Sequence, residues 1–343
     1  MIMIRCKPVR LGLAILLTMV LAACAPAATE APATSAPEQP EEPTAPFRIA
    51  VVAPSPTNDL AFTQSMFDAV NAIAEERGNV EIAFSEGMFV VDDAAAALRD
   101  YAAQGFDLVI AHGSQYGSSL QEIAPDFPET SFAWGTTVDT FGLDNVYAYE
   151  ARSEEGGYVN GVIAASLSQS GVIGVVGPIE TGDAKLYVDG FVAGARSVDP
   201  AVEVNVNWIG SFSDVALASE AAQTHITAGA DVLTGTAQMV VGAIGVAEAN
   251  GVMWFGTQSD QTSLAPDIVV ANQVYDWTVA LKQILTQIHE GQLGGASYAL
   301  TLANGGLKIA FNQGYSVPED VLASADETIA GISDGSITIE MGN

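Results

Sequence analysis

The amino-acid sequence predicts an α/β protein built from two similar lobes. From Phe47 onward, short β-type runs alternate with helical patterns, which is typical of parallel sheets with helices on both faces. The alternation pauses at Glu150–Leu167 and starts again at Val172. The chain has 343 residues, which is enough for two domains of ordinary size.

The segment Glu150–Leu167 is predicted to form the junction between these lobes. Its pattern indicates the end of a strand followed by a helix rich in glycine and alanine. Each glycine costs a helix about 1 kcal/mol relative to alanine, so this composition needs a structural reason. Either the helix packs tightly in a core, or it lies beside a hinge where the chain enters the second lobe. Two lobes joined in this way would place a ligand between them.

The first residues have the pattern of a secretion signal. Basic residues precede the apolar segment Leu11–Ala23, which is too short for a comfortable transmembrane helix. The segment ends in Leu-Ala-Ala-Cys and looks like a bacterial lipobox, in which the cysteine, here Cys24, is lipidated after cleavage. We therefore expect a signal peptide at residues 1–23, a proline-rich disordered tether at 24–46, and a lipid anchor on the extracytoplasmic face of the cell membrane.

The composition is strongly acidic. Lys and Arg number 11 and Asp and Glu number 41, which gives a formal net charge of −30. Such a charge repels nucleic acid and anionic membrane surfaces, so nucleic acid is not expected as a partner. The acidity serves solubility, although a salt-rich habitat would also account for it.

The first lobe is predicted to begin with the continuously apolar run FRIAVVAP, Phe47–Pro54, as expected for a strand buried on both faces. The helix Ser65–Arg77 carries its apolar residues on one face and stops at Gly78. The other elements follow the same alternation: strands Val80–Ser85, Asp107–His112, Thr130–Gly135 and Val146–Tyr149, and helices Val91–Gln104 and Ser118–Ala124.

The second lobe repeats the plan. Its predicted strands are Val172–Val176, Val202–Ile209, Asp231–Leu233, Val252–Phe255 and Ile268–Ala271, and its helices lie near Ala184–Val198, Asp214–Ala228 and Val240–Ala249. The tail adds a helix at Asp276–Glu290, a strand at Leu307–Phe311 and a helix after Pro318. We assign residues 47–151 and about 274–303 to the first lobe and 152–273 and about 304–316 to the second; the helix at 318–335 is assigned to neither.

No motif predicts a cofactor, a metal or a catalytic centre. The chain has no Walker pattern, no G-x-G-x-x-G and no G-x-S-x-G. The three histidines, His112, His225 and His289, lie on separate elements without metal-ligand spacing. Carboxylates are too numerous for a catalytic pair to be excluded by counting, but nothing in the sequence singles one out.

Side chains suited to ligand binding follow several predicted strands, and parallel sheets bind ligands beyond the carboxyl ends of their strands. Aromatic residues at one strand end usually belong to a core. Aromatic residues at strand ends in both lobes fit a flat ligand held between aromatic rings, with amides and carboxylates forming hydrogen bonds to its edge. The candidate binding residues are Asn58, Asp59, Phe62, Tyr116, Trp134, Phe212, Gln238, Gln258, Asp260 and Tyr275.

Several stretches also resemble one protein family. Asp59–Ser65, DLAFTQS, looks like its D-x-x-F-x-Q-S loop, and Gly256–Gln261, GTQSDQ, resembles its G-x-D-S-D-Q pattern. Arg152–Ala164 resembles its crossover helix, and Ile173–Pro200 its I-G-x-V-G … G-F-x-A-G-A … P block. On these motifs the chain resembles the basic membrane protein family, the purine-nucleoside-receptor class of ABC-transporter solute-binding lipoproteins.

This resemblance implies two Rossmann-like lobes joined by a hinge, the type I periplasmic-binding-protein fold, closing on a purine base or nucleoside. It also implies a membrane permease and an ATPase as partners, and a binding protein rather than an enzyme. Three positions depart from the nucleoside-binding pattern. Gln258 stands where the family has an Asp that holds ribose hydroxyls, and Ser118 stands near the position where the family has an Asp that binds the base. Gln273 or a neighbour stands where Lys is common in the family.

Two alternatives to this function stay open at the level of the sequence. The same two-lobed body could hold another small solute or a signalling molecule, and so serve a sensor. A surface lipoprotein hydrolase acting on nucleosides is the second alternative.

Overall fold

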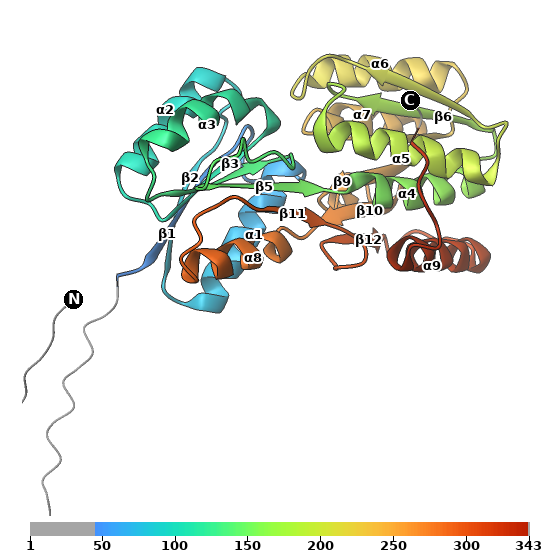
Figure 1. Cartoon of the computed structure of the whole chain (residues 1–343). Helices are drawn as coiled ribbons and strands as arrows, with labels where there is room; N and C mark the ends of the chain where they lie inside the picture. The colour runs from blue at the N-terminus through green and yellow to red at the C-terminus, as the bar shows by residue number, and fades with distance from the viewer. Residues whose placement is uncertain (1–44, 342–343) are drawn as a thin grey trace, which may run out of the picture. The chain divides into compact units, whose positions relative to one another are not determined.

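The computed structural model describes residues 45–341. The predicted signal peptide, Cys24 and nearly all of the predicted tether lie outside the described residues. The described chain forms two six-stranded sheets, each covered by helices on both faces (Figure 1). The α/β class with two lobes, predicted from the alternation of strands and helices, is therefore confirmed.

The first lobe is built on a sheet with the strand order β11-β5-β4-β3-β1-β2, in which all neighbours run parallel. Its strands are β1 (Phe47–Val52), β2 (Val80–Ser85), β3 (Leu108–His112), β4 (Ser131–Gly135), β5 (Val146–Ala151) and β11 (Ser297–Leu300). Successive residues of β1 point to opposite faces. Ile49 and Val51 pack with helices α1 (Phe62–Arg77) and α8 (Thr278–His289), and Ala50 and Val52 pack with α2 (Val91–Ala103) and α3 (Gly117–Ile123).

The second lobe has the strand order β12-β10-β9-β8-β6-β7, with β12 antiparallel to β10 and the other neighbours parallel. Its strands are β6 (Val172–Gly177), β7 (Glu203–Trp208), β8 (Val232–Gly235), β9 (Met253–Gln258), β10 (Val269–Tyr275) and β12 (Leu307–Phe311). One core contains α4 (Ser153–Leu167), α5 (Gly182–Val198) and α9 (Glu319–Asp334), and the other contains α6 (Val215–Thr227) and α7 (Val240–Asn250). Short 3-10 helices occur at Ser114–Tyr116, Ala124–Asp126 and Thr262–Leu264.

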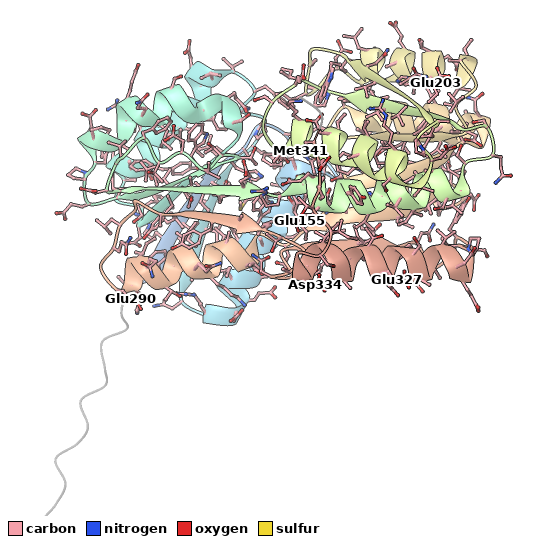
Figure 2. The ribbon with its side chains drawn as sticks, turned by 45° about the vertical axis from the view of Figure 1, so that its right-hand side comes forward. Glu155, Glu203, Glu290, Glu327, Asp334 and Met341 are labelled. Carbon is pink, nitrogen blue, oxygen red and sulfur yellow. The ribbon has the colours of Figure 1, made fainter. Side chains whose placement is uncertain are left out.

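The chain passes between the two sheets three times: between β5 and α4, between β10 and α8, and between β11 and β12. Glu155 on α4, labelled in Figure 2, accepts a hydrogen bond of 2.7 Å from the backbone N–H of Leu302, which ties the first crossing to the third. Lys308 on β12 pairs with Asp276 at 2.8 Å, beside the second crossing. These contacts join the three connections between the lobes to one another.

Helices α4 and α5 pack with their backbones in contact. A methyl group added at Gly161 would lie 2.1 Å from the carbonyl oxygen of Phe191, and one at Gly194 would lie 2.0 Å from that of Tyr158. Only glycine fits at such a distance, which accounts for the composition of the junction helix. The helix is tightly packed, and it also begins directly after the first crossing, so both interpretations of its glycines describe part of its role.

One strand was not predicted, and several predicted elements have other bounds, such as β10, which ends at Tyr275 rather than Ala271. Strand β11 was not predicted, because Ser297–Leu300 is a four-residue edge strand with an exposed serine and too short a pattern to recognise. Helix α1 begins at Phe62 rather than Ser65. The carboxylate of Asp59 accepts hydrogen bonds from the backbone N–H groups of Ala61, Thr63 and Gln64, and this extends the helix toward its loop.

The acidic residues are spread over the surfaces of both lobes. Figure 2 labels Glu203 on β7, Glu290 after α8 and Glu327 on α9, and all three are exposed. This distribution agrees with the expected repulsion of nucleic acid.

Candidate ligand-binding site

A cavity lies where strand-end loops of both sheets meet; its empty space, including the part open to solvent, is about 390 Å³. The first lobe contributes Pro54, Phe62, Phe89, Gly113, Ser114, Gln115 and Thr136 to its lining, and the second contributes Asp183, Ala184, Phe212, Ala237, Gln238 and Gln258. These residues follow the carboxyl ends of β1, β2, β3, β4, β6, β7 and β8 or end β9, as expected for ligand binding in parallel sheets. Four of the ten predicted binding residues, Phe62, Phe212, Gln238 and Gln258, line this cavity.

The ring of Phe62 is held in place by an aromatic cluster behind it. The imidazole of His112 stacks on this ring with centroids 3.8 Å apart and planes 8° apart, and Trp277 meets it edge-on at 6.4 Å. His112 Nε2 donates to the carbonyl oxygen of Phe62 at 3.1 Å, and Nδ1 accepts from the Tyr149 hydroxyl at 2.8 Å. One face of the Phe62 ring is thus covered, which leaves the rest of the ring for the cavity.

His112 is neutral in this cluster. It is fully buried, and burial lowers its pKa to about 3, against which its hydrogen bond to Phe62 acts only partly. The ring therefore supports Phe62 without adding a charge near the ligand. His112 itself is not among the residues that line the cavity, so it lies behind the cavity wall.

Asp183, in the first turn of α5, is the acidic residue among the described residues that line the cavity. Its carboxylate accepts hydrogen bonds from Thr136 Oγ1 at 3.1 Å, from the Tyr275 hydroxyl at 3.0 Å and from Gln258 Nε2 at 3.5 Å. Thr136 belongs to the first lobe and the other donors to the second, so Asp183 connects the two lobes. Burial raises the pKa of Asp183, and these hydrogen bonds act in the opposite direction.

Two of the three glutamines that line the cavity have unused acceptors. In the described part of the chain, Oε1 of Gln238 and Oε1 of Gln258 are buried without a hydrogen-bond partner. The backbone beside them is also unusual, because Ala237 has a φ of 72° and Gln258 a φ of 75°. Non-glycine residues in this conformation cost about 1–3 kcal/mol each, and such strain concentrates at ligand-binding sites.

Two further contacts join the lobes beside the cavity. Ser259 Oγ donates to the carbonyl oxygen of Ala61 at 2.8 Å, and Gln261 Nε2 donates to that of Leu60 at 3.4 Å. Leu60 has a φ of 51°, so a third strained residue lies at the point where the lobes touch.

The other predicted residues of the first lobe lie outside the cavity lining. Asn58 is exposed. Asp59 uses its carboxylate on backbone N–H groups of its own loop and on Ser55 Oγ, 2.6 Å away. Tyr116 donates to the carbonyl oxygen of Met88 at 2.7 Å, and Trp134 donates to that of Gly113 at 3.2 Å, so these two rings support loops that reach the cavity.

The remaining predicted residues of the second lobe, Asp260 and Tyr275, line a separate open groove. Asp260 accepts from Asn272 Nδ2 at 3.0 Å and from the backbone N–H of Thr262 at 2.9 Å. Tyr275 lies one step behind the cavity, since its hydroxyl donates to Asp183.

Sequence reasoning missed Asp183 and Thr136. Both follow strand ends, so the rule that selected the other candidates would also have found them. Asp183 directly precedes the predicted helix near Ala184–Val198, where acidic residues are common, so its residue type did not distinguish it.

The profile of the Bmp family, described as ABC transporter substrate-binding protein PnrA-like, matches residues 47–338. The chain belongs to this family. A purine-binding protein of Brucella abortus is 29% identical over 293 residues, which cover 85% of this chain and 82% of that protein. The ABC transporter nucleoside-binding protein BmpA of Lactococcus lactis is 25% identical over 310 residues, 82% of this chain and 85% of its own. The crystal structure of an ABC transporter solute-binding protein from Aeropyrum pernix has a TM-score of 0.74 at 21% identity, covering 87% of this chain and 94% of that one.

Membership of the Bmp family makes this protein an ABC transporter solute-binding protein with the type I fold of two lobes joined by a hinge. The family implies a small-molecule ligand, an extracytoplasmic location, and a permease and an ATPase as partners. The two relatives named above are likewise binding proteins rather than enzymes. None of the helices within residues 45–341 is long and apolar enough to cross a bilayer.

Proposed function

We propose that this Bmp-family protein is a lipid-anchored receptor that binds a purine-type ligand, nucleobase or nucleoside, and delivers it to an ABC importer. The observation that carries the proposal is the cavity, in which Phe62 and Phe212 from different lobes combine with the amides of Gln238 and Gln258.

The chemistry of the cavity suits a flat heterocycle. Aromatic rings contact the faces of such a ligand, and amide and carboxylate groups form hydrogen bonds with its edge. The relatives from Brucella abortus and Lactococcus lactis, named for purine and nucleoside binding, support the same class of ligand.

The neutral Gln258 favours a free base over its nucleoside. In nucleoside binders of the family the resemblance puts an Asp at this position, where it holds ribose hydroxyls. Hydrogen bonds to a charged group contribute about 1.5–3 kcal/mol, more than those to a neutral amide. We therefore expect adenine or guanine to compete well with adenosine or guanosine.

Thermal-shift screening of purines, nucleosides and sugars tests the ligand class. A ligand at about 100 times its Kd adds roughly 2.7 kcal/mol to the free energy of unfolding, so a true ligand gives a clear rise in Tm. Stabilisation by a sugar alone would overturn the purine proposal, and conversion of a nucleoside during incubation would show an enzyme.

The lipid anchor has a separate test. Cys24→Ser should abolish the incorporation of radiolabelled fatty acid and change the fractionation of the protein with membranes. A variant that is still labelled and still fractionates unchanged would contradict the anchor and leave the binding function untouched.

A further inference from the structure

The cavity holds more hydrogen-bond acceptors than its own donors satisfy. Within the described residues, Gln238 Oε1 and Gln258 Oε1 are buried and have no partner. An ionised carboxylate offers about four acceptor positions. In Asp183, Oδ1 accepts from Thr136 at 3.1 Å, Oδ2 accepts from Tyr275 at 3.0 Å and from Gln258 only at 3.5 Å, and the backbone N–H of Asp183 also donates to the carboxylate. The long contact with Gln258 is the one that a ligand N–H would replace. A ligand that donates hydrogen bonds would satisfy these groups, whereas one that only accepts would leave them unpaired.

The charge in the cavity points in the same direction. No Lys or Arg is present among the described residues that line it, and Asp183 is its only acidic residue there. An anionic ligand, such as a nucleotide, would meet a buried carboxylate without a compensating cation. A neutral ligand rich in N–H groups meets no such obstacle.

We propose that Asp183 determines the specificity of the site, by accepting two adjacent N–H groups from a neutral 2-amino-6-oxopurine of the guanine type. This proposal rests on the proposed purine-binding function. The ring N–H and the neighbouring amino group of such a base present two donors side by side, which match the two oxygens of a carboxylate. Gln238 or Gln258 accepts the remaining N–H groups. The adenine edge places an acceptor beside its amino group, so it pairs less well with a carboxylate.

Equilibrium dialysis with radiolabelled guanine and hypoxanthine tests the proposal, because hypoxanthine lacks only the amino group. The natural protein should bind guanine about 10-fold or more tightly than hypoxanthine. Asp183→Asn should weaken guanine binding by about 10- to 100-fold and bring the ratio of the two affinities close to one. Asp189→Asn is the matched control, because Asp189 lies on the same helix, pairs with Lys185 and does not line the cavity; it should leave the ratio unchanged.

The outcomes separate the two proposals. If no purine binds to the natural protein, the proposed function fails. If purines bind but hypoxanthine equals guanine, or the preference survives in Asp183→Asn, only the role of Asp183 is overturned. Should Asp183→Asn not fold, competition by 1-methylguanine on the natural protein replaces it, since the methyl group blocks one donor; competition equal to that of guanine overturns the role of Asp183.

Discussion

The two walls of the cavity differ in how far they are complete without a ligand. In the wall from the first lobe, Phe62 is stacked on His112, and both nitrogens of His112 have hydrogen-bond partners. In the wall from the second lobe, Gln238 and Gln258 have buried oxygens without partners. Both walls are packed, but among the described residues that line the cavity only those of the second wall have buried oxygens without a hydrogen-bond partner.

Because of this difference, the two walls contribute differently to ligand affinity and to ligand specificity. A prebuilt aromatic wall holds any ring of the right shape, and so supplies affinity with little discrimination. Unpaired acceptors form hydrogen bonds only with a ligand that has donors in matching positions, and so they discriminate between ligands of similar shape.

The largest effect is expected from the aromatic wall. Phe62→Ala should weaken the binding of every purine by about 100-fold, because it removes a buried aromatic surface worth about 3 kcal/mol. Isothermal titration calorimetry with adenine, guanine and hypoxanthine measures the change. Phe67→Ala is the control, since Phe67 lies on the same helix but packs against Phe84. A loss confined to one of the three bases would contradict the division between the walls.

A 10- to 100-fold change in preference is expected at Gln258. Gln258→Asp should favour nucleosides over free bases, because a carboxylate holds ribose hydroxyls more strongly than an amide does. The new carboxylate would also lie near Asp183, now 3.5 Å from Gln258 Nε2, so the affinity for free bases should fall. Calorimetry with guanine and guanosine on both proteins decides the point. The idea fails if the natural protein already prefers nucleosides strongly, or if the ratio does not move.

The neutral His112 predicts a pH dependence of stability. Because its pKa is about 3 in the folded protein and near 6.5 when unfolded, the unfolded state binds a proton first as the pH falls. Stability should therefore be lost between pH 6.5 and 3, by about 1.4 kcal/mol per pH unit from this residue. Urea unfolding at pH 7, 5.5 and 4.5 should give a shallower loss for His112→Gln. His289→Gln, at an exposed position, should match the natural protein; equal slopes for all three would exclude the neutral buried imidazole.

The smallest effect is expected at the contact between the lobes. Ser259→Ala removes the hydrogen bond to the carbonyl oxygen of Ala61, worth about 1 kcal/mol, so ligand affinity should fall about fivefold. In small-angle scattering, ligand should reduce the radius of gyration of the natural protein, and Ser259→Ala should require more ligand for the same reduction. An identical scattering curve with and without saturating ligand would show that the hinge does not close.

The fold was more predictable than the site. Alternating strands and helices are a property of local sequence, so most elements were found within a few residues. The four-residue β11 was not, since its pairing with β5 depends on a strand almost 150 residues earlier in the chain. For the site, four of the residues predicted from aromatic and amide side chains at strand ends line the cavity: Phe62, Phe212, Gln238 and Gln258. Their neighbour Asp183 looks in the sequence like an ordinary first-turn acid, and only its contact with Thr136 of the other lobe reveals its place.

The glycine contact between α4 and α5 links the hinge to the ligand. The two backbones are in direct contact at these glycines, without side chains between them that could change rotamer. We therefore expect α4 and α5 to move together as one rigid unit. The first residues of α4 lie at the first crossing between the lobes. The first turn of α5 carries Asp183, which lines the cavity. A change in the angle between the lobes therefore moves Asp183 directly, and by thermodynamic reciprocity a bound ligand biases that angle by the same free energy. A transporter that recognises the distance between the two lobes would in this way distinguish the ligand-bound receptor from the ligand-free one.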